Sequence, residues 1–209
     1  MTVQVLTAYV VSTDPKISVI PDFLSPAECE HLITVSGRAG FERSLVGRGA
    51  YATNAVDKSE GFVNQFSDNR TSLSVMLAAA VDDVVAGIEL RLAGLVQLPV
   101  EQLEQLVVVK YEPGQYFNVH HDGIFRPVTV FIYLNDLPEN GGGETHFPEL
   151  GIRVSPKAGT AVVWKNSSFD PITQSLLQDE RLRHAGLATN NCTKYGVNCF
   201  FNYNEMRTS

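Results

Sequence analysis

The stretch that decides the fold is YEPGQYFNVHHDG, residues 111–123, which continues the β-branched run LVVVKY of residues 106–111. His120 and Asp122 stand two residues apart, and side chains at i and i+2 of an extended strand project from the same face. One imidazole and one carboxylate can therefore meet a single metal ion, with His184 downstream as a second imidazole. Two histidines and one carboxylate suit non-haem Fe(II) and its oxygen chemistry. An H-x-D match alone also fits a hydrogen-bonded turn, so the flanking sequence must decide.

Two longer segments carry ordered motifs on either side of these residues. Residues 126–164 read RPVTVFIYLNDLPENGGGETHFPELGIRVSPKAGTAVVW, and residues 184–200 read HAGLATNNCTKYGVNCF. Together with residues 111–123 they resemble the prolyl 4-hydroxylase branch of the Fe(II)- and 2-oxoglutarate-dependent dioxygenases, over about the C-terminal half of the chain. The motifs met are Y-x-x-G-Q (111–115), H-x-D (120–122), R-x-x-T (126–129), Y-L-N/S-D (133–136), G-G-E-T-x-F-P (142–148) and P-K-x-G-x-A-x-x-W (156–164).

The resemblance implies roles for individual residues. Fe(II) would be bound by His120, Asp122 and His184, and no further acid–base side chain is required for catalysis. Lys194 stands ten residues after His184, as in the family, and would anchor the distal carboxylate of 2-oxoglutarate. Hydroxyl donors to that carboxylate would come from Tyr111 and Thr145.

The chain departs from the family pattern at a few positions. Leu187 and Ala188 follow the H-A-G of residues 184–186, where many members have a proline. The aromatic residue two positions after the motif glutamine is Phe117, and Phe200 replaces a frequent tryptophan six residues after the lysine. Either aromatic change could alter how the co-substrate or the substrate is held, but neither touches a metal ligand.

The implied reaction is hydroxylation of prolyl residues in a peptide or protein, with O2 consumed and 2-oxoglutarate converted to succinate and CO2. Ascorbate is a further expected reductant. Retention of Asp122 favours hydroxylation, because related halogenases carry a small residue there. A binding or scaffolding module without catalysis would not need all of His120, Asp122, His184 and Lys194. A hydroxylase of a free amino acid or another small molecule is the alternative that the sequence leaves open.

Composition restricts the partners and the compartment. The chain has 209 residues with 44% hydrophobic and 19% charged content, which is ordinary for one soluble domain. Residues 1–99 are expected to supply helical support and a candidate lid, and residues 100–209 the catalytic core. A net charge of -7 argues against a nucleic-acid partner. Without a membrane-length apolar segment or a recognisable signal peptide, no membrane partner is expected and the predicted setting is cytoplasmic. The sequence makes no prediction about oligomeric state.

Local patterns predict an α+β chain with a mainly β core. Ser25, Pro26 and Glu28 form a capping box that predicts a helix to about Ser36. An apolar stripe predicts a second helix over residues 71–95. The resemblance sharpens the fold to a double-stranded β-helix, the cupin-like jelly roll. Strands are predicted at residues 17–23, 106–111, 129–135, 151–154, 160–164 and 195–202.

The remaining polar residues have less specific interpretations. The glycine-punctuated segment of residues 47–61 fits either a solvated loop or a lid over the substrate. Arg70 is interpreted as a surface ion pair in preference to a substrate contact. His121 is expected to face away from the ligands in a supporting or packing role, His146 to be exposed, and His31 to be a surface or packing residue.

Overall fold

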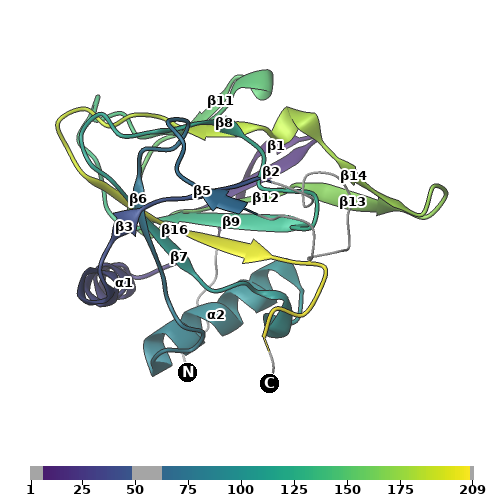
Figure 1. Ribbon diagram of the computed structural model, residues 1–209, viewed down its shortest axis with the longest axis horizontal. Coiled ribbons are helices and arrows are strands. Elements are labelled where there is room, and N and C mark those ends of the chain that lie inside the picture. The colour runs from purple at the N-terminus through teal and green to yellow at the C-terminus, as the bar shows by residue number, and fades with distance from the viewer. Residues whose placement is uncertain (1–6, 49–62, 208–209) are drawn as a thin grey trace.

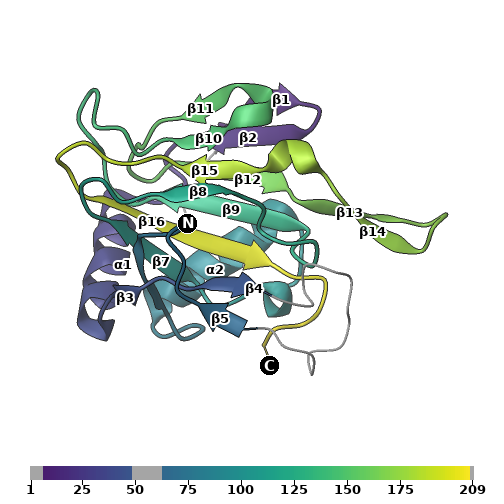
Figure 2. The ribbon, with the colours of Figure 1, turned by 45° about the horizontal axis from the view of Figure 1, so that its top comes forward.

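A computed structural model of the protein describes residues 7–48 and 63–207 (Figure 1). Two antiparallel sheets face each other, and two helices cover the outer face of the larger one (Figures 1 and 2). The larger sheet has the order β1 (Tyr9–Thr13), β2 (Lys16–Ile20), β12 (Ala161–Lys165), β9 (Val128–Tyr133), β16 (Lys194–Phe201), β7 (Val107–Tyr111), β6 (Leu73–Met76) and β3 (Glu42–Arg43). The smaller sheet has the order β11 (Ile152–Val154), β10 (Thr145–Phe147), β15 (His184–Gly186) and β8 (Phe117–His120).

The chain crosses repeatedly between these two sheets. It passes from β7 in the larger sheet to β8 in the smaller, back to β9, across to β10 and β11, back to β12, and finally through β15 to β16. This winding is the predicted double-stranded β-helix. It brings β8 and β15, which carry the histidines of interest, side by side in the smaller sheet.

The two faces of the larger sheet bury different side chains. In β9, Val128, Val130 and Ile132 pack with apolar residues of the helices in one core, whereas Phe131 and Tyr133 lie in a second core shared with the smaller sheet. Side chains alternate between the faces of a strand, so all six residues of β9 are buried. Its run of β-branched and aromatic residues is typical of a strand covered on both faces.

The first helix forms as predicted. In α1 (Pro26–Ala39), the Ser25 hydroxyl accepts from the backbone N–H of Glu28, and the Glu28 carboxylate accepts from that of Ser25. These two bonds satisfy donors that a helix start leaves unpaired. The helix ends at Ala39, and Gly40 follows as the C-cap residue with a φ of 91°. Glycine adopts this conformation readily because it has no Cβ.

The second predicted helix, residues 71–95, is wrong in its first half. Residues 73–76 form β6, which pairs with β7, and α2 (Asp83–Val96) begins only after Asp82. The Asp82 carboxylate accepts from the backbone N–H of Val85 at 2.9 Å and so fixes the helix start. The period-two placement of Leu73 and Val75 suits a strand, and the pairing of β6 with β7 on one side and β3 on the other outweighs the apparent helical stripe.

Other boundaries differ from the prediction to a smaller extent. The strand expected at residues 17–23 ends at Ile20, and Asp22 takes a positive φ of 53°. Short strands such as β10 and β15 were not predicted, because three residues carry little periodic signal. The extended strand assumed for His120 and Asp122 ends at His120, where β8 stops. The candidate lid, residues 47–61, lies outside the described residues apart from positions 47 and 48.

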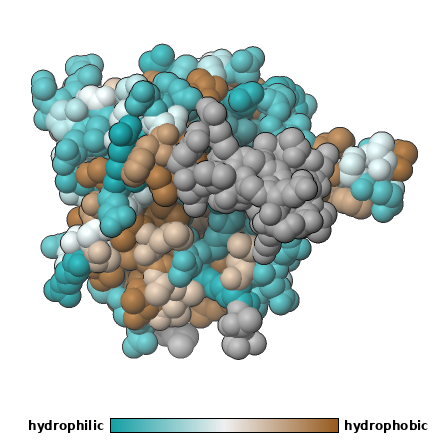
Figure 3. Space-filling model, viewed as in Figure 1, coloured by the Kyte–Doolittle hydropathy of each residue, from teal (hydrophilic) through white to brown (hydrophobic). Residues whose placement is uncertain are grey.

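Smaller elements complete the described part of the chain. A hairpin of β13 (Ser167–Asp170) and β14 (Ser175–Gln178) projects from the body, with apolar and polar residues along it (Figures 1 and 3). β4 (Val46–Arg48) pairs with β5 (Val63–Gln65). Single 3-10 turns occur at Val100–Gln102, Pro148–Leu150 and Glu180–Leu182. Within residues 7–48 and 63–207, no helix combines the length and apolarity that crossing a membrane would require.

Candidate metal and co-substrate site

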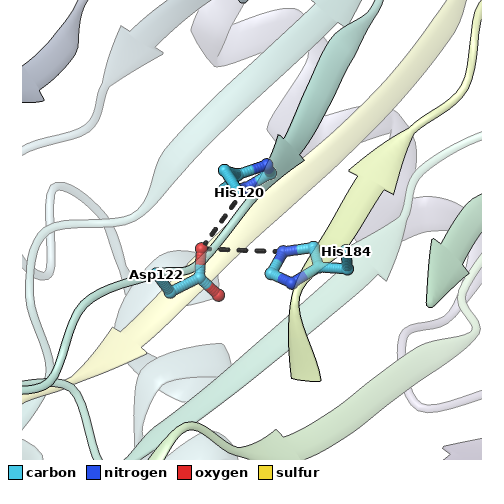
Figure 4. A group of neighbouring side chains, drawn as sticks. All are labelled: His120, Asp122 and His184. Atoms are coloured by element: carbon cyan, nitrogen blue, oxygen red, sulfur yellow. Dashed lines mark ion pairs between the residues drawn. The ribbon is translucent and has the colours of Figure 1, made fainter. Parts of the chain in front are cut away.

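Two histidines and one aspartate converge between β8 and β15. His120 ends β8 and lies opposite His184, the first residue of β15, in the strand register. Asp122 follows in the loop after β8, and its Oδ1 lies 3.6 Å from Nε2 of His120 and 3.7 Å from Nε2 of His184. Figure 4 shows the three side chains pointing toward one another. Their ligand atoms all lie within 4.8 Å of one another, so one ion could contact all three.

Backbone carbonyl groups fix the proton on each imidazole. Nδ1 of His120 lies 2.8 Å from the carbonyl oxygen of Asn118, and Nδ1 of His184 lies 3.0 Å from that of Leu182. A carbonyl oxygen only accepts, so Nδ1 carries the proton and donates it in both rings. The Nε2 atoms, which carry no proton in the neutral form of each ring, are the ones that face Asp122. Metal-binding histidines are commonly oriented in this way.

The charges of the buried groups also suit a cation. Burial by itself would raise the pKa of Asp122, but His184, His120 and a hydrogen bond from Thr129 outweigh it and hold the pKa well below its ordinary value. Burial lowers the pKa of His184 to about 4, against the opposing effect of Asp122. At neutral pH the site therefore presents a neutral His184 and an ionised carboxylate. This nitrogen and oxygen donor set fits Fe(II), and the identity of the ion stays a prediction.

The three residues form part of the wall of a cavity. About 450 Å³ of empty space, some of it open to solvent, lies between the sheets at this point. The lining combines aromatic groups with ionisable or polar groups. In ligand sites the apolar groups usually bury the ligand and the polar groups fix its orientation. The other lining residues include Arg70, Tyr111, Phe117, Phe131, Thr145, Trp164, Lys194, Asn198 and Phe200.

Lys194 is the buried cation of this cavity. It begins β16 opposite Tyr111 of β7 and is only 1% exposed. Within the part of the chain that the structure describes, its ammonium donates one hydrogen bond, to the Gly143 carbonyl oxygen at 2.8 Å, and forms no ion pair. Burial lowers the pKa of Lys194 to about 7, weakly opposed by Glu144. A buried ammonium with unused donors fits an anionic carboxylate such as that of 2-oxoglutarate.

The two predicted hydroxyl donors also lie in the cavity wall. Burial raises the pKa of Tyr111, so its phenol keeps a proton to donate. Oγ1 of Thr145 lies 2.7 Å from the hydroxyl of Tyr133, which sequence reasoning had not assigned to the site. Tyr133 thus holds Thr145 in place. Contact of Tyr111 and Thr145 with a co-substrate stays a prediction.

Arg70 is a cavity residue and not the surface ion pair that was predicted. Its guanidinium group donates to Oγ of Ser72 and to the carbonyl oxygen of Leu45, both at 3.2 Å, and no carboxylate partner occurs within the described residues. The group lies 4.7 Å from the ring centre of Phe117, which stacks on His120 with 3.5 Å between ring centres. An isolated antiparallel β-bridge pairs the backbone of Arg70 with that of Phe117, and this pairing places the arginine beside the cavity. Such pairing across strands is invisible in the local sequence.

The other histidines lie outside the triad. Nδ1 of His121 accepts from the backbone N–H of Gly123 at 3.1 Å, in keeping with a supporting role. His146 of β10 is half-buried, so the prediction of an exposed side chain is wrong, because β10 pairs on both sides with β11 and β15. His31 lies 2.8 Å from Asp82 at the start of α2.

Comparison with known proteins gives concordant matches. Residues 106–202 match the 2OG-Fe(II) oxygenase superfamily. Prolyl 4-hydroxylase 2 of Arabidopsis thaliana is 33% identical over 193 residues, which is 78% of this chain and 60% of the relative. Probable prolyl 4-hydroxylase 10 of the same plant is 30% identical over 227 residues, with 95% of this chain and 72% of the relative covered.

The fold has solved counterparts as well. The viral collagen prolyl hydroxylase of Paramecium Bursaria Chlorella virus-1, in its 2OG complex, superposes with a TM-score of 0.66 at 24% identity, covering 88% of this chain and 94% of that one. This likeness supports the double-stranded β-helix. The chain spans about six tenths of the length of the first curated relatives that it matches.

Proposed function

The chain belongs to the prolyl 4-hydroxylase family of the 2OG-Fe(II) oxygenase superfamily, and from this membership we propose that it hydroxylates prolyl residues in a peptide or protein. The reaction would use Fe(II), O2 and 2-oxoglutarate, with ascorbate as a supporting reductant. The observation that carries the proposal is the placement of Lys194 in the same cavity as His120, Asp122 and His184. A triad that could hold a cation and a buried ammonium with no ion-pair partner among the described residues together match the two ends of a metal-chelating dicarboxylate.

The side chains of the cavity have separate tasks in this proposal. Nε2 of His120, Nε2 of His184 and Oδ1 of Asp122 would hold Fe(II). When bound with 2-oxoglutarate and O2, the iron supplies an oxidant strong enough for an unactivated C–H bond, while 2-oxoglutarate becomes succinate and CO2. Lys194 would orient the co-substrate by pairing with its distal carboxylate. The same pairing would offset the cost of burying the ammonium group.

Aromatic side chains would receive the substrate ring. Phe117, Trp164 and Phe200 line the cavity beside the triad. A pyrrolidine ring is compact and apolar, so aromatic faces can contact it closely and exclude water from the reacting carbon. The Phe117 ring is held in place by its contacts with the Arg70 guanidinium, 4.7 Å from the ring centre, and with the His120 ring that stacks on it. These side chains would position the pyrrolidine ring of the substrate, and no general acid or base is needed.

Mass spectrometry can separate a peptide substrate from a free amino acid. A proline-rich peptide and free proline are each incubated with the enzyme, Fe(II) and 2-oxoglutarate, with and without ascorbate, and the His184→Ala variant is the matched control. The proposal expects one added oxygen atom on peptidyl proline, none on free proline, and none with the variant. Hydroxylation of free proline with an unchanged peptide would instead establish the small-molecule alternative.

A further inference from the structure

Asn166, directly after β12, is a buried residue whose side chain connects two other parts of the fold. It is 0% exposed. Its Oδ1 accepts from Nε1 of Trp164 at 2.8 Å, and its Nδ2 donates to Oγ1 of Thr129 at 2.8 Å and to the carbonyl oxygen of Arg126 at 3.0 Å. Both amide N–H groups and the amide oxygen are therefore occupied. Oγ1 of Thr129 in turn donates to Oδ2 of Asp122 at 2.7 Å.

The chemistry of the two ends fixes the direction of this chain of hydrogen bonds. The indole N–H of Trp164 can only donate, so the amide oxygen of Asn166 must face it and the amide nitrogen must face Thr129. Thr129 then accepts from Asn166, and its own proton is left for Asp122. An ionised carboxylate only accepts, so the chain ends there without an unpaired group.

This arrangement divides the two carboxylate oxygens of Asp122 between different partners. Oδ2 is taken by Thr129, whereas Oδ1 is the oxygen that lies 3.6 Å and 3.7 Å from Nε2 of His120 and His184. A rotation of the carboxyl group would break the bond from Thr129. The hydrogen bond therefore holds the plane of the carboxylate with one oxygen toward the metal position.

We propose that Asn166 is a positioning residue of the metal site, which acts through Thr129 to hold Asp122 in the orientation that binds the ion. The inference rests on the proposed function, because it takes the triad as a metal site. Asn166 touches neither the ion nor the substrate in this proposal.

The position of Thr129 argues against a purely structural role for its hydroxyl group. Thr129 lies in β9 between Trp164 of β12 and Phe200 of β16, at a fully buried position of the larger sheet. Valine has nearly the same shape and would fill this space without the cost of desolvating a hydroxyl group. The hydrogen-bond partners that the structure gives to this hydroxyl are Asp122 and Asn166. A hydroxyl group at this buried position is therefore explained by the hydrogen bond that orients the carboxylate of Asp122.

Metal titration of the full chain tests the proposal. Anaerobic calorimetry with Fe(II) alone measures the affinity of the parent and of Thr129→Val, Asn166→Asp and the double variant. Loss of a residue that orients a ligand typically weakens metal binding by about 10- to 100-fold. We expect that loss in each single variant and little further loss in the double variant, because both changes break the same connection. Thr129→Ser keeps the hydroxyl group and should retain the affinity of the parent.

The possible outcomes separate this inference from the proposed function. If the parent chain bound no Fe(II), the proposed function itself would fail. If the parent bound Fe(II) and the variants bound it equally well, even with lower melting temperatures, Asn166 and Thr129 would be structural only and the inference would be overturned. Should Asn166→Asp fail to fold, Trp164→Phe replaces it, since it removes the donor that directs the amide. The Trp164 ring also lies against His184, and the loss of that contact would weaken Fe(II) binding in both backgrounds alike. The substitution should therefore weaken Fe(II) binding more in the parent than in the Thr129→Val background, and equal losses in both backgrounds would refute the connection.

Discussion

Replacing Lys194 by methionine should stabilise the protein while weakening its binding of 2-oxoglutarate. Burial lowers the pKa of this lysine from an ordinary value of 10.5 to about 7. At about 1.36 kcal/mol per pKa unit, the difference of 3.5 units means that keeping the charged group costs the folded state roughly 5 kcal/mol. Loss of the hydrogen bond to Gly143 offsets about 1 kcal/mol of the gain. A net gain of about 4 kcal/mol is therefore expected for Lys194→Met.

The gain should depend on pH in one direction. Between pH 7 and 10.5 the unfolded parent holds a proton on Lys194 that the folded parent lacks, so the stability of the parent rises with pH across this window. The advantage of the methionine variant is then complete below about pH 7 and disappears as the pH approaches 10.5. Urea unfolding of the metal-free and co-substrate-free proteins at several pH values measures it.

The same substitution should raise the concentration of 2-oxoglutarate that the enzyme needs. Removal of one partner of a desolvated, hydrogen-bonded charge pair typically costs about 2–5 kcal/mol, which is roughly a 30-fold to several-thousand-fold loss of affinity. Lys194→Arg keeps the charge with a longer planar head and should keep part of the affinity. A methionine variant that was no more stable at pH 6, and that bound 2-oxoglutarate as well as the parent, would refute the assignment. Arg70 would then be the next cation to test.

Three further substitutions give independent checks. His184→Ala should fold but lose turnover and Fe(II) affinity, and full affinity in anaerobic titration would contradict its assignment as a ligand. Gly159→Ala should lower the free energy of unfolding by about 1–3 kcal/mol in urea, because φ is +75° and the new Cβ would overlap the carbonyl oxygen of Leu24; an unchanged midpoint would contradict the described turn. Arg207→Met should cost about 3–5 kcal/mol by leaving Glu89, which is 2% exposed, without its ion-pair partner. Addition of Glu89→Gln should restore part of that loss, and no restoration would mean that the pairing is not the cause.

The grouping of His120 and Asp122 in one site could be predicted because the signal is local, whereas His184 was added by the resemblance. His120 and Asp122 stand two residues apart, and their flanks match motifs over many ordered positions. The structure brings them together although β8 ends at His120 and Asp122 lies in the loop that follows, outside the extended strand that the spacing argument assumed. The spacing from His184 and the resemblance predict a place for Lys194 in the same site, and the structure puts it in the same cavity. Its placement opposite Tyr111 depends on pairing between β16 and β7. Distant pairing of this kind has no signature in either segment alone.

The prediction of one helix over residues 71–95 is wrong for a different physical reason. Residues 72–75 alternate polar and apolar side chains with period two, while residues 81–95 follow the helical period, and the short alternating run merges with the helical stripe in the sequence. The Asp82 cap marks the boundary, but an aspartate beside Asp83 does not show locally which of the two caps the helix. Asn166 and Arg70 likewise have ordinary neighbours in the sequence. Their roles arise from tertiary contacts with Thr129 and Phe117.

The central claim, 2-oxoglutarate-dependent hydroxylation of peptidyl proline, is tested most directly by one coupled measurement. The enzyme, Fe(II), 2-oxoglutarate and a proline-rich peptide are incubated under isotopically heavy O2, and the peptide and succinate are quantified together by mass spectrometry. The prediction is one heavy oxygen atom on a prolyl residue for each succinate formed, with neither product in the His184→Ala variant. Succinate formed without a labelled prolyl residue, or hydroxylated peptide formed without 2-oxoglutarate, would contradict the claim.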